Sequence, residues 1–164
     1  MDGSCAWLPP LMELENFRGD WNAYLDALYS VFTNDFIAYR PRFDGLPVQR
    51  RRYPLVRNKE ATFWHIIAEG PIEEERTPDL RRCERIRWPK PVIEQARRQG
   101  QKIWKNKRGT QTCICIWIED ADYLVVLADR DDYVLLLTAY CVTQAHTKRK
   151  LEKEYRAYKA SAAP

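Results

Sequence analysis

The stretch YLVVLADRDDYVLLLTAYCV, residues 123–142, decides the fold class. It contains two apolar runs, Tyr123–Ala128 and Tyr133–Val142, that are rich in the Val, Leu and Tyr residues favoured in strands. Only the polar residues Asp129–Asp132 separate the two runs. Because a connection this short joins antiparallel neighbours, the stretch predicts a β-hairpin.

Two further strands are predicted immediately before this hairpin. Lys102–Asn106 and Thr112–Glu119 have the same β-forming composition. Turn-forming residues lie in the connections that follow them, Arg108-Gly109 and Asp120-Ala121-Asp122. Four strands joined by short connections predict an antiparallel meander.

Helical periodicity replaces this alternation in the chain before Gly100. Helices are predicted over residues 11–17, 20–32, 59–69, 77–87 and 91–99, with a short extended segment over 35–40 and an irregular, arginine-rich region over 41–57. A highly charged helix is predicted over Thr147–Lys159. The predicted fold is therefore α+β, with N-terminal helices packed on a C-terminal four-stranded antiparallel sheet and a C-terminal helix.

Length and composition predict one domain over residues 1–164. The chain has 164 residues, of which 45% are hydrophobic and 30% charged, as in globular proteins. Its parts are an acidic helical N-terminal part (1–34), a core (59–142), and a C-terminal helix and tail (143–164). Neither a signal peptide nor a membrane span is evident, so a soluble, cytoplasmic protein with no membrane partner is expected.

Charge and cysteine usage narrow the function classes. Net charge is +4, yet residues 1–39 carry six acidic side chains against one basic, so the remaining chain is strongly basic. A basic body favours polyanionic partners such as RNA. Five cysteines without a CxxC pair and only two histidines argue against zinc, so reduced, mostly buried thiols and no metal or cofactor are expected.

His65 is the most informative single residue. It lies in the predicted helix 59–69, with Glu69 one turn later on the same face. A histidine whose tautomer is fixed by a carboxylate can act as a general base near neutral pH. The alternative is a structural histidine, hydrogen-bonded at the edge of the core.

The segment DLRRCERIRW (residues 79–88) offers a cationic site. Arg81 and Arg85 share one helical stripe, and Arg82 lies one position round. Guanidinium groups match the oxygens of a phosphate with two parallel donors. Because Glu73–Glu75 and Glu84 are close in sequence, a solvated ion-pair surface is the alternative interpretation.

The last strand places two polar side chains together. By period-2 alternation Thr138 and Tyr140 fall on one face, and Leu135, Leu137, Ala139 and Cys141 fall on the other, predicted to be the core face. Thr138 and Tyr140 could donate hydrogen bonds to a phosphate or stack on a base. Ordinary β-propensity would also explain both residues.

Three of these features occur in a recognisable order. The motif FWHII (63–67), the arginine-rich helix leading to IRW (86–88) and the hairpin YLVVLADRDDYVLLLTAY (123–140) resemble phage and prophage members of the barnase–EndoU–colicin–RelE ribonuclease superfamily. The resemblance covers residues 59–142, and the full catalytic sets of barnase and EndoU do not align onto the chain. It implies helices packed on a four-stranded antiparallel sheet.

The resemblance further implies a metal-independent endoribonuclease, a toxin or phage-defence effector that uses the RNA 2′-hydroxyl as nucleophile. His65 would then be the base or acid, and Arg81, Arg82 or Arg85 would stabilise phosphate charge. Thr138 and Tyr140 would position the substrate, with Glu69 or Tyr140 as the second proton-transfer group. An antitoxin or other inhibitory protein is the expected partner besides RNA.

Two hypotheses without catalysis remain beside the nuclease. In the first, the protein is an RNA- or protein-binding module in which His65 is structural and Arg50, Arg51 and Arg52 carry the affinity. In the second, it is a phage accessory protein that acts only through protein contacts. Replacement of His65 separates the nuclease from both.

Overall fold

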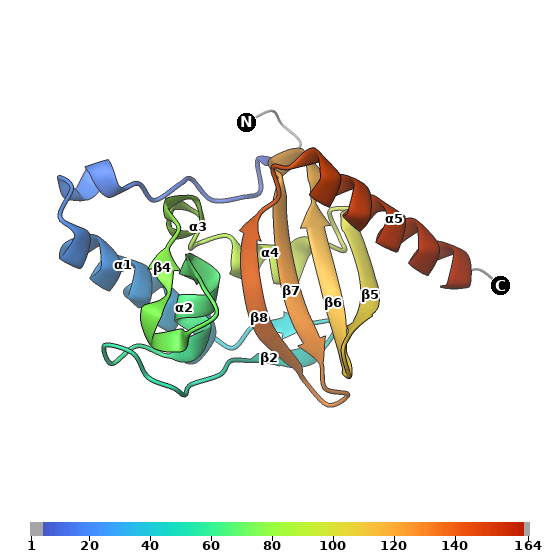
Figure 1. Ribbon diagram of the computed structural model, residues 1–164, viewed down its shortest axis with the longest axis horizontal. Coiled ribbons are helices and arrows are strands. Elements are labelled where there is room, and N and C mark those ends of the chain that lie inside the picture. The colour runs from blue at the N-terminus through green and yellow to red at the C-terminus, as the bar shows by residue number, and fades with distance from the viewer. Residues whose placement is uncertain (1–4, 163–164) are drawn as a thin grey trace.

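A twisted, six-stranded mixed sheet is the centre of the computed structural model, which describes residues 5–162 (Figure 1). The spatial order of its strands is β1-β2-β8-β7-β6-β5. The strands are β1 (Arg42–Phe43), β2 (Leu46–Gln49), β5 (Lys102–Arg108), β6 (Gln111–Ile118), β7 (Tyr123–Asp129) and β8 (Val134–Cys141). The α+β class is thereby confirmed, and β5 to β8 form antiparallel neighbours in chain order.

The prediction of only four, purely antiparallel strands was wrong. Strands β1 and β2 come from the segment predicted to be irregular, and β2 runs parallel to β8 through the pairs Val48–Val134 and Gln49–Leu135. These two strands span two and four residues. Runs this short, with a proline at position 47, give no period-2 pattern that a sequence could display.

A β-bulge in β8 changes the predicted assignment of its faces. Leu127 pairs with Leu136, whereas the preceding Val126 pairs with Thr138, so Leu137 is the extra residue. The bulge buries Leu136 in the main core, while Leu135, predicted on the core face, stays partly exposed. Beyond the bulge, Ala139 faces the main core as predicted. Leu137, also predicted on the core face, packs instead against the cluster around Trp104 and Trp117 on the other face, so the predicted faces are inverted up to and including Leu137.

The helices are mostly shorter than predicted. They are α1 (Trp21–Thr33), α2 (Ala61–Ile67), α3 (Leu80–Glu84), α4 (Pro89–Gln95) and α5 (Ala145–Ala162), with 3-10 turns at Leu14–Phe17, Glu73–Glu75 and Glu119–Ala121. A small separate ladder pairs β3 (Ala68–Glu69) with β4 (Thr77–Pro78). Helix α3 begins after Asp79, whose carboxylate accepts a hydrogen bond from the Arg81 amide.

A π-helix over Asn34–Ala38 replaces the predicted extended segment 35–40. It continues α1 directly, and its buried Phe36 packs against Phe32 with ring centroids 5.7 Å apart. This packing outweighs the β-forming composition of the segment.

Two hydrophobic cores lie on the two faces of the sheet. The main core joins one face to α1–α4; α2 and α3 contact β8, and α4 contacts β6 and β7. Figure 1 shows α1, α2 and α3 grouped beside β8, with α4 behind the sheet. The second core lies between the other face and α5, and contains Trp104, Trp117, Leu124, Val126 and Leu151. Of the helices within residues 5–162, none has the length and apolarity needed to cross a membrane.

Candidate functional site

The predicted site residues meet at the C-terminal end of α2, where it lies against β8 and α3. The last carbonyls of a helix have no partners within the helix, so other groups must bind them. Thr138 Oγ1 donates to the His65 carbonyl at 2.9 Å. Arg82 Nη1 donates to the carbonyls of Ala68 at 2.9 Å and His65 at 3.3 Å. These contacts hold β8 and α3 against the end of α2.

The ring of His65 forms a close pair with Glu73. Its Nε2 lies 2.8 Å from Glu73 Oε1 and 2.9 Å from Oε2, and the histidine side chain is 19% exposed. The predicted partner, Glu69, was wrong. Helix α2 ends at Ile67, so Glu69 leaves the helical face, and the 3-10 turn at Glu73–Glu75 brings Glu73 back to the ring.

This pair selects one tautomer of the imidazole. An ionised carboxylate can only accept a hydrogen bond, so Nε2 carries the proton and, in the neutral ring, the lone pair is on Nδ1. No residue within 5–162 forms a hydrogen bond with Nδ1. Burial lowers the pKa of His65 below its usual 6.5, and the charges of Arg76 and Arg51 act in the same direction, whereas Glu73 opposes them. A neutral histidine at pH 7 is what a general base requires.

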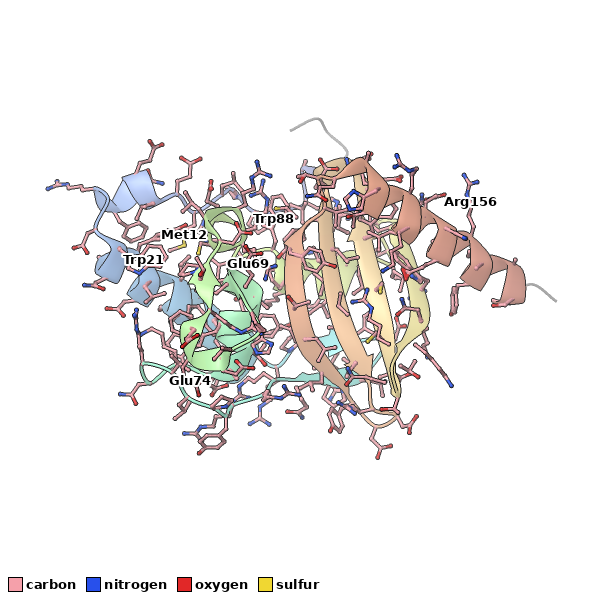
Figure 2. All side chains as sticks on the ribbon, in the orientation of Figure 1. Met12, Trp21, Glu69, Glu74, Trp88 and Arg156 are labelled. Carbon is pink, nitrogen blue, oxygen red and sulfur yellow. The ribbon has the colours of Figure 1, made fainter. Side chains whose placement is uncertain are left out.

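Arg76 and Arg51 lie close enough to act on the charge of this pair, and Arg82 lies beside it at the end of α2. Arg76 Nε lies 3.5 Å from Glu73 Oε2. Arg82 lies over the ring of Tyr140, at 5.3 Å from its centroid, and 3.7 Å from Glu69. Arg51 and His65 line the same small cavity. Figure 2 shows Glu69 on the side of α2 that faces β8 and Glu74 at the far end of this segment, away from the sheet.

The structure separates the other predicted residues from this cluster. Arg50 forms a two-point ion pair with the buried Glu60, with Nε 2.7 Å from Oε1 and Nη2 3.4 Å from Oε2. Arg52 lies over the exposed ring of Tyr53 at 5.5 Å. Arg81 is exposed on α3.

Arg85 occupies an intermediate position beside the cluster. Its Nη1 donates to the Arg81 carbonyl, and its guanidinium lies 5.1 Å from the centroid of Trp88. The buried Nε has no hydrogen-bond partner within residues 5–162. Its charge is also close enough to Cys141, at the end of β8, to oppose the rise that burial causes in the pKa of that thiol.

The space beside His65 is small. The cavity measures about 10 Å³ and is lined by Arg51, Thr62, His65 and residues 135–137. A space of this size holds one water molecule. A substrate would therefore have to lie across the surface of the cluster.

Sequence reasoning missed Glu73 and Arg76. Their only signal was the turn-forming Gly70-Pro71 after the helix, which reverses the chain and returns the acidic run GluGluGlu (73–75) toward His65. Spacing alone favoured Glu69, because the histidine helix was expected to continue to that residue.

Comparisons of the chain with protein-family models, with curated proteins and with solved structures gave no match. Within residues 5–162, no three His, Cys, Asp or Glu side chains come together in a group that could hold a metal ion. The chemistry available at the cluster is proton transfer by His65 and charge stabilisation by arginine.

Proposed function

We propose that this protein is a metal-independent endoribonuclease in which the His65–Glu73 pair is the general base. The observation that carries the proposal is the 2.8 Å contact between His65 Nε2 and the Glu73 carboxylate, which leaves Nδ1 as the proton acceptor. Three of the other predicted residues (Arg82, Thr138 and Tyr140) lie at the same helix end.

The proposed reaction is transesterification at a phosphodiester. His65 Nδ1 accepts the proton of the ribose 2′-hydroxyl, and the 2′-oxygen forms a bond to phosphorus. The bond from phosphorus to the 5′-oxygen breaks, which gives a 2′,3′-cyclic phosphate and a free 5′-hydroxyl. Arg82 and Arg51 stabilise the charge that develops on the phosphate oxygens. Tyr140, which contacts Arg82, supplies the proton to the leaving oxygen.

In the cell such an activity would act in the cytoplasm as a toxin or phage-defence effector, restrained by an antitoxin. The basic body of the chain suits both an RNA substrate and an acidic inhibitor.

Purified protein in EDTA, incubated with total bacterial RNA, tests the proposal. The wild type is expected to release fragments ending in 2′,3′-cyclic phosphate, and His65→Gln to lose at least about a hundredfold in rate, the usual scale of general-base catalysis. The matched control is His146→Gln, because His146 is exposed and lies on α5, remote in sequence from the cluster. Intact RNA with the wild type, or equal cleavage by His65→Gln, would reject the nuclease.

A non-catalytic RNA-binding module is the second candidate, and a separate observation favours it. Arg51 and Arg52 are exposed, and Tyr53 is 64% exposed beneath the guanidinium of Arg52. Exposed aromatic rings beside arginine can stack on the bases of single-stranded RNA. Because Arg50 is already paired with Glu60, Arg51→Gln and Arg52→Gln should weaken RNA binding in a filter assay, whereas Arg50→Gln should affect folding stability instead.

A further inference from the structure

A larger cavity lies away from the His65 cluster and shares no lining residue with it. Its volume is about 440 Å³, within the usual range of small-molecule sites. The N-terminal segment, the π-helix that follows α1, and α4 form its walls. The residues with polar side chains that line it are Trp7, Asn34, Asp35, Arg87, Lys90, Glu94 and Gln95.

The charged groups around this cavity do not neutralise one another by direct contact. Neither the side chain of Asp35 nor that of Arg87 forms a hydrogen bond or an ion pair with any residue of 5–162. Lys90 lies 3.8 Å from the ring centroid of Tyr39, and the hydroxyl of Tyr39 donates to Glu94. Burial raises the pKa of Asp35 and the charge of Glu94 adds to that rise, whereas the charges of Lys90 and Arg87 act against it. Two cations and a half-buried carboxylate therefore remain available to a ligand.

Two further structural features occur at the walls of this cavity. Within residues 5–162, the buried Nε1 atom of Trp7 has no hydrogen-bond partner, although a buried indole N–H normally has one. The helix is wider than an α-helix over Asn34–Ala38, because a π-helical turn contains more residues, and Asn34 and Asp35 line the cavity there. Turns of this kind are rare and recur at functional sites.

We propose that this cavity binds a nucleoside monophosphate, with the phosphate at Arg87 and Lys90 and the amino edge of the base at Asp35. Phosphate oxygens match the two cations, and an exocyclic amino group donates to a carboxylate. The half-buried Trp7 and the proline rings of Pro9 and Pro91 provide flat apolar walls against which a base can stack. The same chemistry could come from a free nucleotide or from the end of an RNA strand.

Isothermal titration of the full chain tests this site. The probes are AMP, CMP, GMP and UMP, the nucleoside cytidine, inorganic phosphate, and a short RNA with a terminal phosphate. The amino-bearing nucleotides should bind more tightly than UMP, whose base presents carbonyls on both sides of its N–H. Cytidine and inorganic phosphate should each bind at least about tenfold more weakly than CMP, since each loses one half of the contacts.

Three variants locate the binding. Asp35→Asn and Lys90→Gln should each weaken CMP binding about tenfold, the effect of one charge-assisted hydrogen bond. Asp26→Asn is the matched control, because Asp26 is an exposed acidic residue of α1 outside the cavity. Circular dichroism and the unfolding midpoint establish that each variant is folded. If CMP and the RNA bind equally, the end of a strand is the ligand; if only CMP binds, a free nucleotide is.

The proposal fails if no nucleotide binds at millimolar concentration, if phosphate alone binds as well as CMP, or if Asp35→Asn binds CMP like the wild type. It is independent of RNA cleavage. His65→Gln should retain CMP binding, so a protein that binds nucleotide without cutting RNA would reject only the nuclease.

Discussion

His65 acts through its backbone and its ring at the same time. Its carbonyl accepts hydrogen bonds from Thr138 and Arg82, and these bonds connect α2 to β8 and α3. The ring is held by Glu73, a contact that fixes its orientation. Because Arg82 and Thr138 also stabilise the fold, their replacement would change structure and activity together. Variants of His65 and Glu73 are therefore the sharper tests of chemistry.

The lowered pKa of His65 predicts how stability depends on pH. Since burial disfavours the protonated ring, the unfolded chain binds this proton more readily than the folded one. The contribution of neutral His65 is fully present above its unfolded pKa of 6.5 and is lost as pH falls through 6.5 toward the folded pKa. Urea unfolding at a series of pH values between about 5 and 8 measures this effect. As pH falls, the free energy of unfolding should decrease more steeply for the wild type than for His65→Gln.

Glutamine is the appropriate replacement in that experiment, because its amide can still donate to Glu73 but does not titrate. Carboxylates that titrate at lower pH are present in both proteins and cancel in the comparison. Equal slopes for the two proteins would contradict the assignment of a buried, neutral His65.

At the residue scale, the sequence predicted which residues belong to the candidate site better than it predicted the contacts between them. His65, Arg82, Thr138 and Tyr140 were chosen for their chemistry, and the structure brings them together. Their connection through the carbonyl of His65 was not predictable, because it depends on where α2 ends and on a strand 73 positions later. The partner carboxylate was missed for the same reason.

The bulge in strand β8 decides which of its side chains enter the main core. Its bulge at Leu137 puts Leu136 in the main core at 1% exposure, whereas Leu135 is only partly buried. Leu136→Ala should therefore lower the free energy of unfolding by about 2–5 kcal/mol, the cost of a core cavity, and Leu135→Ala by less than about 1.5 kcal/mol. Denaturant titration of the two variants measures the difference. If Leu135→Ala were the more destabilising variant, Leu135 would face the main core, as simple alternation without a bulge predicts.

At the element scale, long periodic segments were predictable and local interruptions were not. The strands from Lys102 to Cys141 each span seven or eight residues and carry enough apolar positions to be recognised. The bulge at Leu137, the π-helix at Asn34–Ala38 and the two-residue strand β1 each depend on tertiary packing. No local composition specifies such features.

On the scale of the whole molecule, the sheet is covered on both faces by different parts of the chain. Helices that precede the meander cover the main core, and α5, which follows it, covers the second. Salt bridges also attach α5 to β5, through Glu152 and Lys102, and to the turn between β6 and β7, through Lys148 and Asp122. The Asn106 amide donates to Glu154 at 2.8 Å. The sequence predicted this helix. Its highly charged composition did not indicate which surface the helix packs against.

Leu151 is the side chain of α5 that is buried in the second core. Leu151 is 3% exposed in the second core, beside Trp104 and Trp117, whereas the neighbouring Lys153 is exposed. Leu151→Ala should cost at least about 2 kcal/mol of stability. It should also release α5 before the rest of the chain unfolds, because the main core does not include this helix.

Limited proteolysis with tryptophan fluorescence measures this separation. In Leu151→Ala, cleavage within Ala145–Ala162 should accelerate, and emission should shift to the red as Trp104 and Trp117 become hydrated. Lys153→Ala, on the same helix, should behave like the wild type. If Leu151→Ala lowers global stability without faster cleavage of α5, the two cores unfold as one cooperative unit, and the second core contributes directly to the stability of the helix end that holds His65.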